Sequence, residues 1–155
     1  MAGRPHIVAL IVAAGSGTRA GEGVPKQYRA LDGRPVLAHA IDPLAGHPAI
    51  DAIQVVIGAD QEELYRDAVG ERPLLPPVTG GCERRESARN GLEAIAQAGG
   101  ADVVVIHDAA RPFCPPDVID RLLAALGDHD GAVPALPVAD TLARADGGLG
   151  DTVAR

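Results

Sequence analysis

Apolar runs separated by amphipathic stretches recur along the chain and predict alternating strands and helices. The runs at residues 7–13, 52–58 and 102–106 are short and almost continuously apolar, which is typical of strands buried on both faces of a sheet. Weaker strands are predicted at residues 74–78 and 131–138, where prolines interrupt the apolar pattern.

Four stretches between and after these strands have helical spacing. They cover residues 35–46, 61–69, 83–98 and 116–126. We expect Pro43 to kink the first helix or end it early, and Asp60 to cap the start of the second. The third helix presents Ala88, Leu92 and Ile95 on one face, which predicts the side that it buries.

The order of these elements predicts the fold class. Repeated β-α alternation with apolar strands indicates an α/β protein with a Rossmann-like, doubly wound, mostly parallel sheet. We expect a nucleotide-binding core over residues 1–139 and a protruding arm or hairpin near the C-terminus, over residues 140–155. Because such sheets bind ligands at the carboxyl ends of their strands, the loops that follow the strands are the candidate sites.

Composition narrows the classes of function. The net charge of −7, the pI near 5.1 and the 2% of aromatic residues argue against a nucleic-acid surface, which needs basic patches or stacking platforms. Cys82 and Cys114 lack the spacing of a zinc site or a disulfide framework, which fits a reducing cytoplasm. No apolar run approaches the ~20 residues of a membrane span. We therefore expect a cytoplasmic protein with a focused site for a small anion.

The loop after the first strand carries the strongest chemical signal. Val12-Ala13-Ala14-Gly15-Ser16-Gly17-Thr18-Arg19 is followed by Pro25-Lys26-Gln27. Small residues let backbone N–H groups approach a ligand, and Arg19 and Lys26 add two cations, which together suit a polyphosphate. The run also fits the dinucleotide fingerprint, but glycines and a proline follow where that fingerprint requires a helix. Lys26 is not placed as in a Walker A loop, and an ordinary Gly-rich turn would leave both cations unexplained.

Two further motifs follow predicted strands. Gly80-Gly81-Cys82-Glu83-Arg84-Arg85-Glu86-Ser87 opens a helix, and Ser87 could bond a base or ribose; the alternative is a tight turn with a solvated charged start. In His107-Asp108-Ala109-Ala110-Arg111-Pro112, Asp108 could hold a metal or a hydroxyl and Arg111 a phosphate; the alternative is a pair that braces the loop. We expect His107 to be packed or hydrogen-bonded, because a phosphate nucleophile needs no general base.

These motifs, with Asp140-Thr141, resemble the 2-C-methyl-D-erythritol 4-phosphate cytidylyltransferase family. The matching runs are residues 13–19, 25–28, 80–87, 107–112 and 140–141. The most specific are Pro25-Lys26-Gln27-Tyr28 and the run from His107 to Pro112. The resemblance implies a fold of the nucleotide-diphospho-sugar transferase type. It also implies an enzyme that couples CTP to 2-C-methyl-D-erythritol 4-phosphate and releases pyrophosphate, in isoprenoid precursor biosynthesis.

The resemblance also implies residue roles. Arg19 and Lys26 would be catalytic, stabilising the transition state at the α-phosphorus of CTP. Asp108, Arg111, Thr141 and Arg155 would hold the methylerythritol phosphate. Mg²⁺ would be bound mainly through the CTP phosphates, with no metal site made by the protein, and the arm would build a homodimer. The residues that would surround the nucleotide are Ala13, Ala14, Gly15, Ser16, Gly17, Gly80, Gly81, Cys82, Ser87, Asp108 and Ala109.

Two other functions fit these motifs, and the chain departs from the family pattern at two places. A ribitol-5-phosphate cytidylyltransferase is the nearest alternative, and a non-catalytic nucleotide-sensing domain is one from a different class. Retention of both Arg19 and Lys26 speaks against the sensor, since binding alone would not require both cations. The family often has a basic residue where this chain has Ala143, and it continues beyond the position of Arg155. We therefore expect the amino-terminal part of a longer protein; some relatives carry a second, cyclodiphosphate synthase domain.

Overall fold

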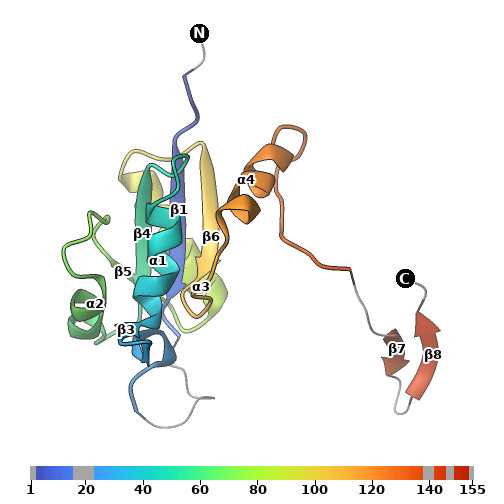
Figure 1. Ribbon diagram of the computed structural model, residues 1–155, viewed down its shortest axis with the longest axis horizontal. Coiled ribbons are helices and arrows are strands. Elements are labelled where there is room, and N and C mark those ends of the chain that lie inside the picture. The colour runs from blue at the N-terminus through green and yellow to red at the C-terminus, as the bar shows by residue number, and fades with distance from the viewer. Residues whose placement is uncertain (1–2, 16–22, 138–141, 146–148, 154–155) are drawn as a thin grey trace. The chain divides into compact units, whose positions relative to one another are not determined.

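The computed structural model describes residues 3–15, 23–137, 142–145 and 149–153 (Figure 1). The chain forms two compact units, Met1–Pro116 and Asp117–Arg155. The first unit holds a four-stranded sheet with helices, and the second holds most of one helix and a two-stranded hairpin.

The sheet of the first unit is entirely parallel. Its strands are β1 (Ile7–Ala13), β4 (Ala52–Ile57), β5 (Val78–Thr79) and β6 (Val103–Asp108), in the order β5-β4-β1-β6. The prediction of a mostly parallel α/β sheet is therefore confirmed, with β1 and β4 close to their expected bounds. The central strand β1 is apolar throughout and five of its residues, Val8 among them, are almost fully buried, since it pairs on both sides.

Two strands differ from their predictions. β5 is confined to Val78–Thr79, because the prolines at 76 and 77 have no N–H to donate to a ladder. β6 runs two residues further than expected, to Asp108, and it is not fully buried: Ile106 is 46% exposed. The reason is its place at the end of the described sheet, where β1 is its one strand partner.

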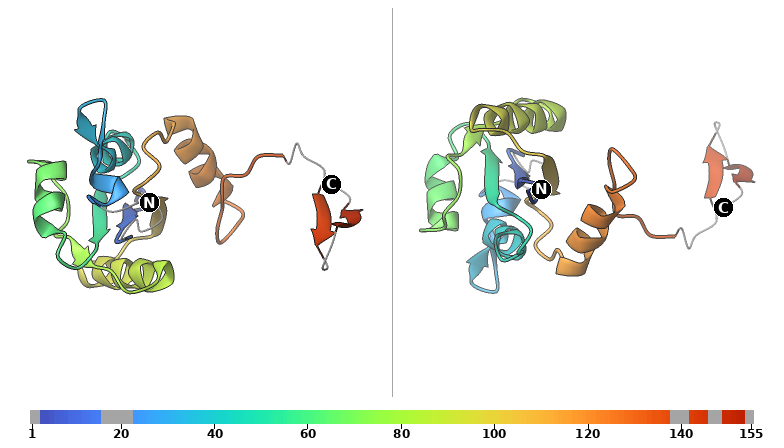
Figure 2. Two further views of the ribbon diagram at one scale, coloured as in Figure 1. Left: turned by 90° about the horizontal axis from the view of Figure 1, so that it is seen from below. Right: turned by 90° about the horizontal axis from the view of Figure 1, so that it is seen from above.

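Helices cover both faces of this sheet. α1 (Val36–Ala45) lies on one face and α3 (Arg84–Gln97) on the other, as the end-on views show (Figure 2). Alternation along β1 serves both layers, with Val8 and Leu10 in a cluster with Ile95 of α3. α2 (Glu62–Val69) follows β4. The core is mostly aliphatic, as the low aromatic content requires, and Tyr28 and Tyr65 are buried with it.

Three helix details correct the predictions. Pro43 lies inside α1 and does not end it early, because the fully buried Ile41 and Leu44 on either side hold the helix against the sheet; the other expected effect, a kink, stays a prediction. Asp60 is no N-cap: its φ is +61°, and α2 begins after Gln61. On α3, Leu92 is 40% exposed rather than buried.

The buried side of α3 is set by a glycine. Ser87, Gly91 and Ile95 are the residues that this helix buries. A Cβ at Gly91 would clash with Leu10 Cδ1, so the glycine is where the helix comes closest to the sheet. Close approach at Gly91 rotates the helix and turns Leu92 outward.

A short segment between β1 and α1 was not foreseen. It comprises the 3-10 helix η2 (Lys26–Tyr28) and a small antiparallel pair, β2 (Ala30–Leu31) with β3 (Arg34–Pro35). Asp32 and Gly33 form the turn with φ values of +50° and +75°. An Asp-Gly dipeptide is a strong hairpin signal, so this pair could have been predicted.

The strand order creates a topological switch point in the sheet. The chain builds β4 and β5 on one side of β1 and then crosses to place β6 on the other side. The carboxyl ends of β1 and β6 are therefore a topological switch point, where doubly wound sheets bind ligands. The loops after these two strands are the ones that carry the first and the last of the core motifs.

The second unit contains most of α4 (Pro116–Ala125) and a hairpin of β7 (Leu142–Ala145) and β8 (Leu149–Val153). The hairpin confirms the expected form of the tail. The strand predicted over 131–138 is absent from the described residues 131–137, where Pro134 and Pro137 cannot donate to a ladder. In the described residues, the helices are too short or too polar to cross a membrane.

Candidate functional site

The structure brings three of the predicted loops together at the carboxyl edge of the sheet. Val12 of β1 pairs with Asp108 of β6, and the Ala109 N–H donates to the Val12 carbonyl at 3.2 Å. On the other side, a Cβ at Gly80 would clash with the Cβ of Ala14. Glycine is needed at 80 because the turn after β5 touches the loop after β1. Loops that the chain separates by more than 60 residues thus share one site.

Lys26 stands beside this site on η2. It is the only lysine among the 155 residues, and it is exposed. Within the described part of the chain it has no ion-pair partner. The next residue, Gln27, is buried and donates to the carbonyls of Ala13 and Gly15, which seats η2 against the end of β1. The backbone of Lys26 is therefore held next to the loop after β1, from which its exposed side chain could serve a polyphosphate.

The start of α3 borders the site on the side of the turn after β5. Glu83 and Glu86 make a capping box, and the Glu86 carboxylate also accepts from the Cys82 N–H at 2.8 Å. Ser87 is 2% exposed; its hydroxyl accepts from the Gly81 N–H at 3.2 Å and donates to the Glu83 carbonyl at 3.1 Å. Ser87 thus shapes the Gly80-Gly81 turn, and its contact with a base or ribose stays a prediction. Cys82 is exposed.

Asp108, at the end of β6, contacts two arginines: Arg84 at the start of α3 and Arg111 in its own loop. Arg84 Nε and Nη2 donate to Asp108 Oδ1 at 3.1 and 2.8 Å, and Arg111 Nε lies 3.3 Å from Asp108 Oδ2. The Asp108–Arg111 pair that would brace the loop is therefore formed in this structure. His107 Nε2 is 2.9 Å from the Arg111 carbonyl oxygen, which confirms a hydrogen-bonded histidine. Two guanidinium groups concentrate positive charge at the edge where a phosphate would enter.

Arg84 was missed as a site residue. It belonged to the Gly80–Ser87 run, but no role was given to its side chain. The signal that could have found it is topological: the ends of parallel strands share one edge, so an arginine after β5 and an acid ending β6 can meet. The positions of Ser16, Gly17, Arg19, Thr141 and Arg155 lie outside the described residues, and their roles stay predictions.

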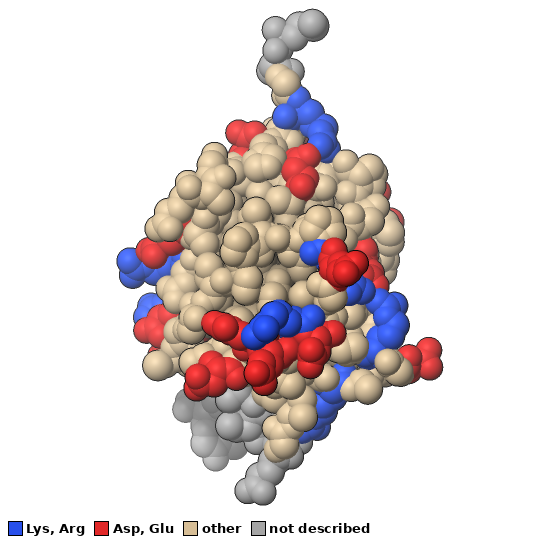
Figure 3. Space-filling model, turned by 90° about the vertical axis from the view of Figure 1, so that its left-hand side faces the viewer, with Lys and Arg blue, Asp and Glu red and all other residues tan. Residues whose placement is uncertain are grey.

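Acidic side chains also gather on one face of the molecule. Acidic side chains cluster on the lower part of the face in Figure 3, on the side where Figure 1 shows α2. α2 itself carries three exposed acidic residues, Glu62, Glu63 and Asp67. The net charge of −7 is thus compatible with a basic carboxyl edge formed by Lys26 and the two arginines.

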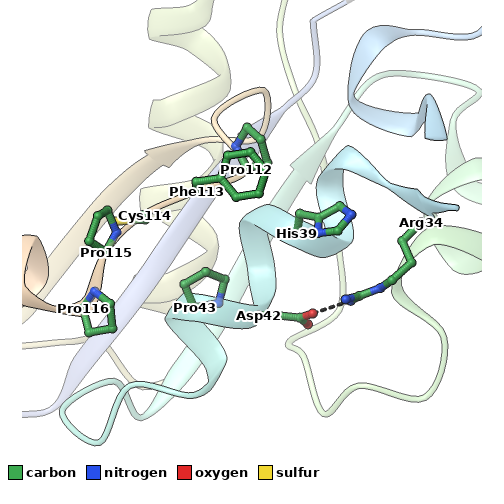
Figure 4. Close-up of a pocket in the computed structure, with 9 residues that line it drawn as sticks. All are labelled: Arg34, His39, Asp42, Pro43, Pro112, Phe113, Cys114, Pro115 and Pro116. Atoms are coloured by element: carbon green, nitrogen blue, oxygen red, sulfur yellow. Dashed lines mark hydrogen bonds and ion pairs between the residues drawn. The ribbon is translucent and has the colours of Figure 1, made fainter. Parts of the chain in front are cut away.

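A pocket of about 450 Å³ lies between α1 and the segment after Arg111 (Figure 4). The rings of His39 and Phe113 are tilted relative to each other, with their centroids 6.2 Å apart, and most of the other lining residues are prolines. Its carboxylate, Asp42, accepts hydrogen bonds from Arg34 and Arg72. Burial alone would raise the pKa of Asp42, but these bonds outweigh it and hold the pKa below its ordinary value. With its charges already paired, this pocket is a poorer candidate than the carboxyl edge.

Comparison with known proteins identifies the family of this chain. The family model of 2-C-methyl-D-erythritol 4-phosphate cytidylyltransferase matches residues 7–155. The bifunctional enzyme IspD/IspF of Rhizorhabdus wittichii is 64% identical over all of this chain and 40% of its own length. That of Rhodospirillum rubrum is 48% identical over 96% of this chain and 39% of its own length. The chain thus spans about two fifths of these relatives.

Solved structures give the same result. A crystal structure of 4-diphosphocytidyl-2C-methyl-D-erythritol synthase superposes with a TM-score of 0.78 at 32% identity, over 99% of this chain and 70% of that one. The bifunctional IspDF of Campylobacter jejuni superposes with a TM-score of 0.75 at 28% identity, over 88% of this chain and 35% of that one. Fold, motifs and sequence agree, and the chain belongs to the 2-C-methyl-D-erythritol 4-phosphate cytidylyltransferase family.

Proposed function

We propose that this protein transfers a cytidylyl group from CTP to 2-C-methyl-D-erythritol 4-phosphate and releases pyrophosphate. The observation that carries the proposal is the meeting of the two most specific motifs at one edge. Gln27 of Pro25-Lys26-Gln27-Tyr28 bonds to the end of β1, and Asp108 of the His107–Pro112 run pairs in register with β1. An ordinary glycine turn would not need both.

The chemistry asks for positioning and charge. The acceptor phosphate is ionised near neutral pH and attacks the α-phosphorus in line, so no general base is required. Lys26, with Arg19, would neutralise the charge that grows on the phosphoryl oxygens. Arg111 would exchange its contact with Asp108 for the acceptor phosphate, since a guanidinium fork matches phosphate oxygens. The turn at Gly80-Gly81 would surround the cytosine.

We propose that Mg²⁺ accompanies CTP, bound mainly by the phosphates. The donor set supports this division: the Asp108 carboxylate already accepts from Arg84 through Oδ1 and faces Arg111 through Oδ2. Within the described residues, no group of three or more His, Cys, Asp or Glu could hold a metal. When bound, Mg²⁺ would neutralise charge on the triphosphate.

Two further properties belong to this proposal. We expect a homodimer in which the hairpin of β7 and β8 contributes to the partner's site, as the resemblance implies. We expect a cytoplasmic location. The chain has two cysteines, Cys82 and Cys114, which lack the spacing of a disulfide framework, and this suits a reducing compartment.

Pyrophosphate release across the four nucleoside triphosphates tests the activity. Each would be assayed with methylerythritol phosphate and with ribitol 5-phosphate as acceptors. Turnover with CTP and methylerythritol phosphate, well above that of every other pair, supports the proposal. Preference for ribitol 5-phosphate would point to the alternative cytidylyltransferase, and no release with any pair would leave a nucleotide-sensing domain.

Lys26 offers a second readout that does not depend on turnover. As the only lysine of these 155 residues, it can be followed by mass spectrometry after reaction with an amine-specific acylating reagent. CTP should protect Lys26 from acylation while the N-terminal amine continues to react. Equal acylation of Lys26 with and without CTP would contradict its place beside the triphosphate.

A further inference from the structure

We infer that Gln27 is a positioning residue, whose buried amide holds Lys26 in reacting position against the loop after β1. The inference rests on the proposed function and adds a role that no motif assigned to this side chain. Gln27 is 3% exposed, which is unusual for a glutamine unless its amide is fully used. Because Gln27 is next to Lys26 in the chain, the hydrogen bonds of its amide can decide where the lysine lies.

The contacts of the Gln27 amide define its orientation. Nε2 donates to the Ala13 carbonyl at 2.6 Å and to the Gly15 carbonyl at 2.9 Å. It also lies 3.4 Å from Gln61 Oε1. All three neighbours are oxygens, so an amide turned the other way would set an acceptor against three acceptors. Both N–H bonds of the amide are therefore committed to the end of β1.

These bonds fix the backbone on which a phosphate would rest. The peptide bonds here are trans, so a carbonyl and the N–H that follows it point in opposite directions. With the Ala13 carbonyl turned to Gln27, the Ala14 N–H points away from the buried amide. Gln27 thereby keeps the Ala14 N–H from turning toward the buried amide.

Gln27 also connects η2 with the ends of two strands, β1 and β4. The Gln27 amide bonds to the Gly15 carbonyl and so links η2 to the loop after β1, and Lys26 is its immediate neighbour. Gln61, which it touches, accepts from the Gly58 N–H at 3.2 Å and so connects η2 to the end of β4. Loss of the amide would let η2 shift relative to the loop, and Lys26 would shift with it.

The chain contains a matched control. Gln54 is 2% exposed, and its Nε2 also donates to two backbone carbonyls, Val55 at 3.2 Å and Pro76 at 2.8 Å. It lies within β4 and is not bonded to the loop after β1 or to η2. Removing either amide should destabilise the fold to a similar extent, and only removal of Gln27 should affect the reaction.

The experiment compares Gln27→Met with Gln54→Met, because methionine keeps the volume and removes the donors. We expect Gln27→Met to lower kcat by roughly 10- to 100-fold, as small misplacement of a catalytic group does. The KM for CTP should change less than about threefold, since the lysine acts chiefly in the transition state. Gln54→Met should keep kcat within about twofold. Urea unfolding of both variants measures the shared loss of stability.

The outcomes separate this inference from the function on which it rests. If the wild-type protein shows no CTP turnover, the proposed function fails first. If it is active and Gln27→Met keeps a near-normal kcat, or Gln54→Met loses as much, the positioning role is overturned. Should Gln27→Met not fold, Gln27→Asn serves instead: it keeps a buried amide that is one methylene too short to reach both carbonyls, and a normal kcat would equally overturn the inference.

Discussion

Replacing Tyr28 by phenylalanine should make the protein more stable, although Tyr28 belongs to the most specific motif. Tyr28 is 8% exposed, and its buried hydroxyl has no hydrogen-bond partner among the described residues. Burying an unsatisfied hydroxyl costs about 1–3 kcal/mol, and removing one oxygen leaves only a small gap. We therefore expect Tyr28→Phe to raise the free energy of unfolding by about 1 kcal/mol at pH 7.

The same side chain should make stability fall at alkaline pH. Burial, with a smaller contribution from Tyr65, raises the pKa of Tyr28 from 10.0 to about 12. As the pH rises, the Tyr28 hydroxyl therefore loses its proton in the unfolded chain before it does so in the folded protein. The stability that the protonated Tyr28 contributes is complete below pH 10 and is lost as the pH rises to 12. The difference between these two pKa values corresponds to a stability loss of roughly 2–3 kcal/mol. Tyr28→Phe should remove this part of the alkaline loss.

Urea unfolding followed by circular dichroism, from pH 7 to the alkaline limit of reversibility, measures both effects. Tyr65→Phe is the matched control: burial also raises the pKa of Tyr65, so the alkaline slope should diminish, without the gain at pH 7. A Tyr28→Phe variant that is less stable at pH 7, or whose pH dependence overlays that of the wild type, would refute the reasoning.

Three further predictions concern the site and its support. Lys26→Ala should lower kcat by ~10²-fold with little change in the KM for CTP, whereas Arg89→Ala, on an exposed pair with Glu93, should leave kcat unchanged. Arg111→Lys should raise the KM for the acceptor several-fold and spare CTP binding, which calorimetry can check; equal damage to CTP affinity would make Arg111 a structural brace. Gly91→Ala should lower the free energy of unfolding by about 1–2 kcal/mol in urea, because the added methyl group overpacks against Leu10 by more than the higher helix propensity of alanine returns. Ala96→Gly on the same helix measures that propensity difference in the opposite direction. A Gly91→Ala variant that is more stable than the wild type would contradict the close approach.

Local pattern alone determined which segments form the sheet and where its chemistry lies. A continuous apolar run such as Ile7–Ala13 can be buried on both faces only in a parallel sheet, and the structure has β1 there. Parallel strands end on one edge, so loops after different strands had to meet. That is why Ala14, Gly80 and Asp108 could be assigned to one site before any contact was known.

Contacts between distant residues were decided only by the tertiary structure. The face that α3 buries follows from Gly91 meeting Leu10, and the course of α1 through Pro43 follows from the burial of Leu44. The Arg84–Asp108 pair depends on α3 and β6 lying side by side at their ends. Propensities act over a few neighbouring residues, whereas a close approach, an ion pair or an overridden proline depends on what the rest of the chain packs against that position.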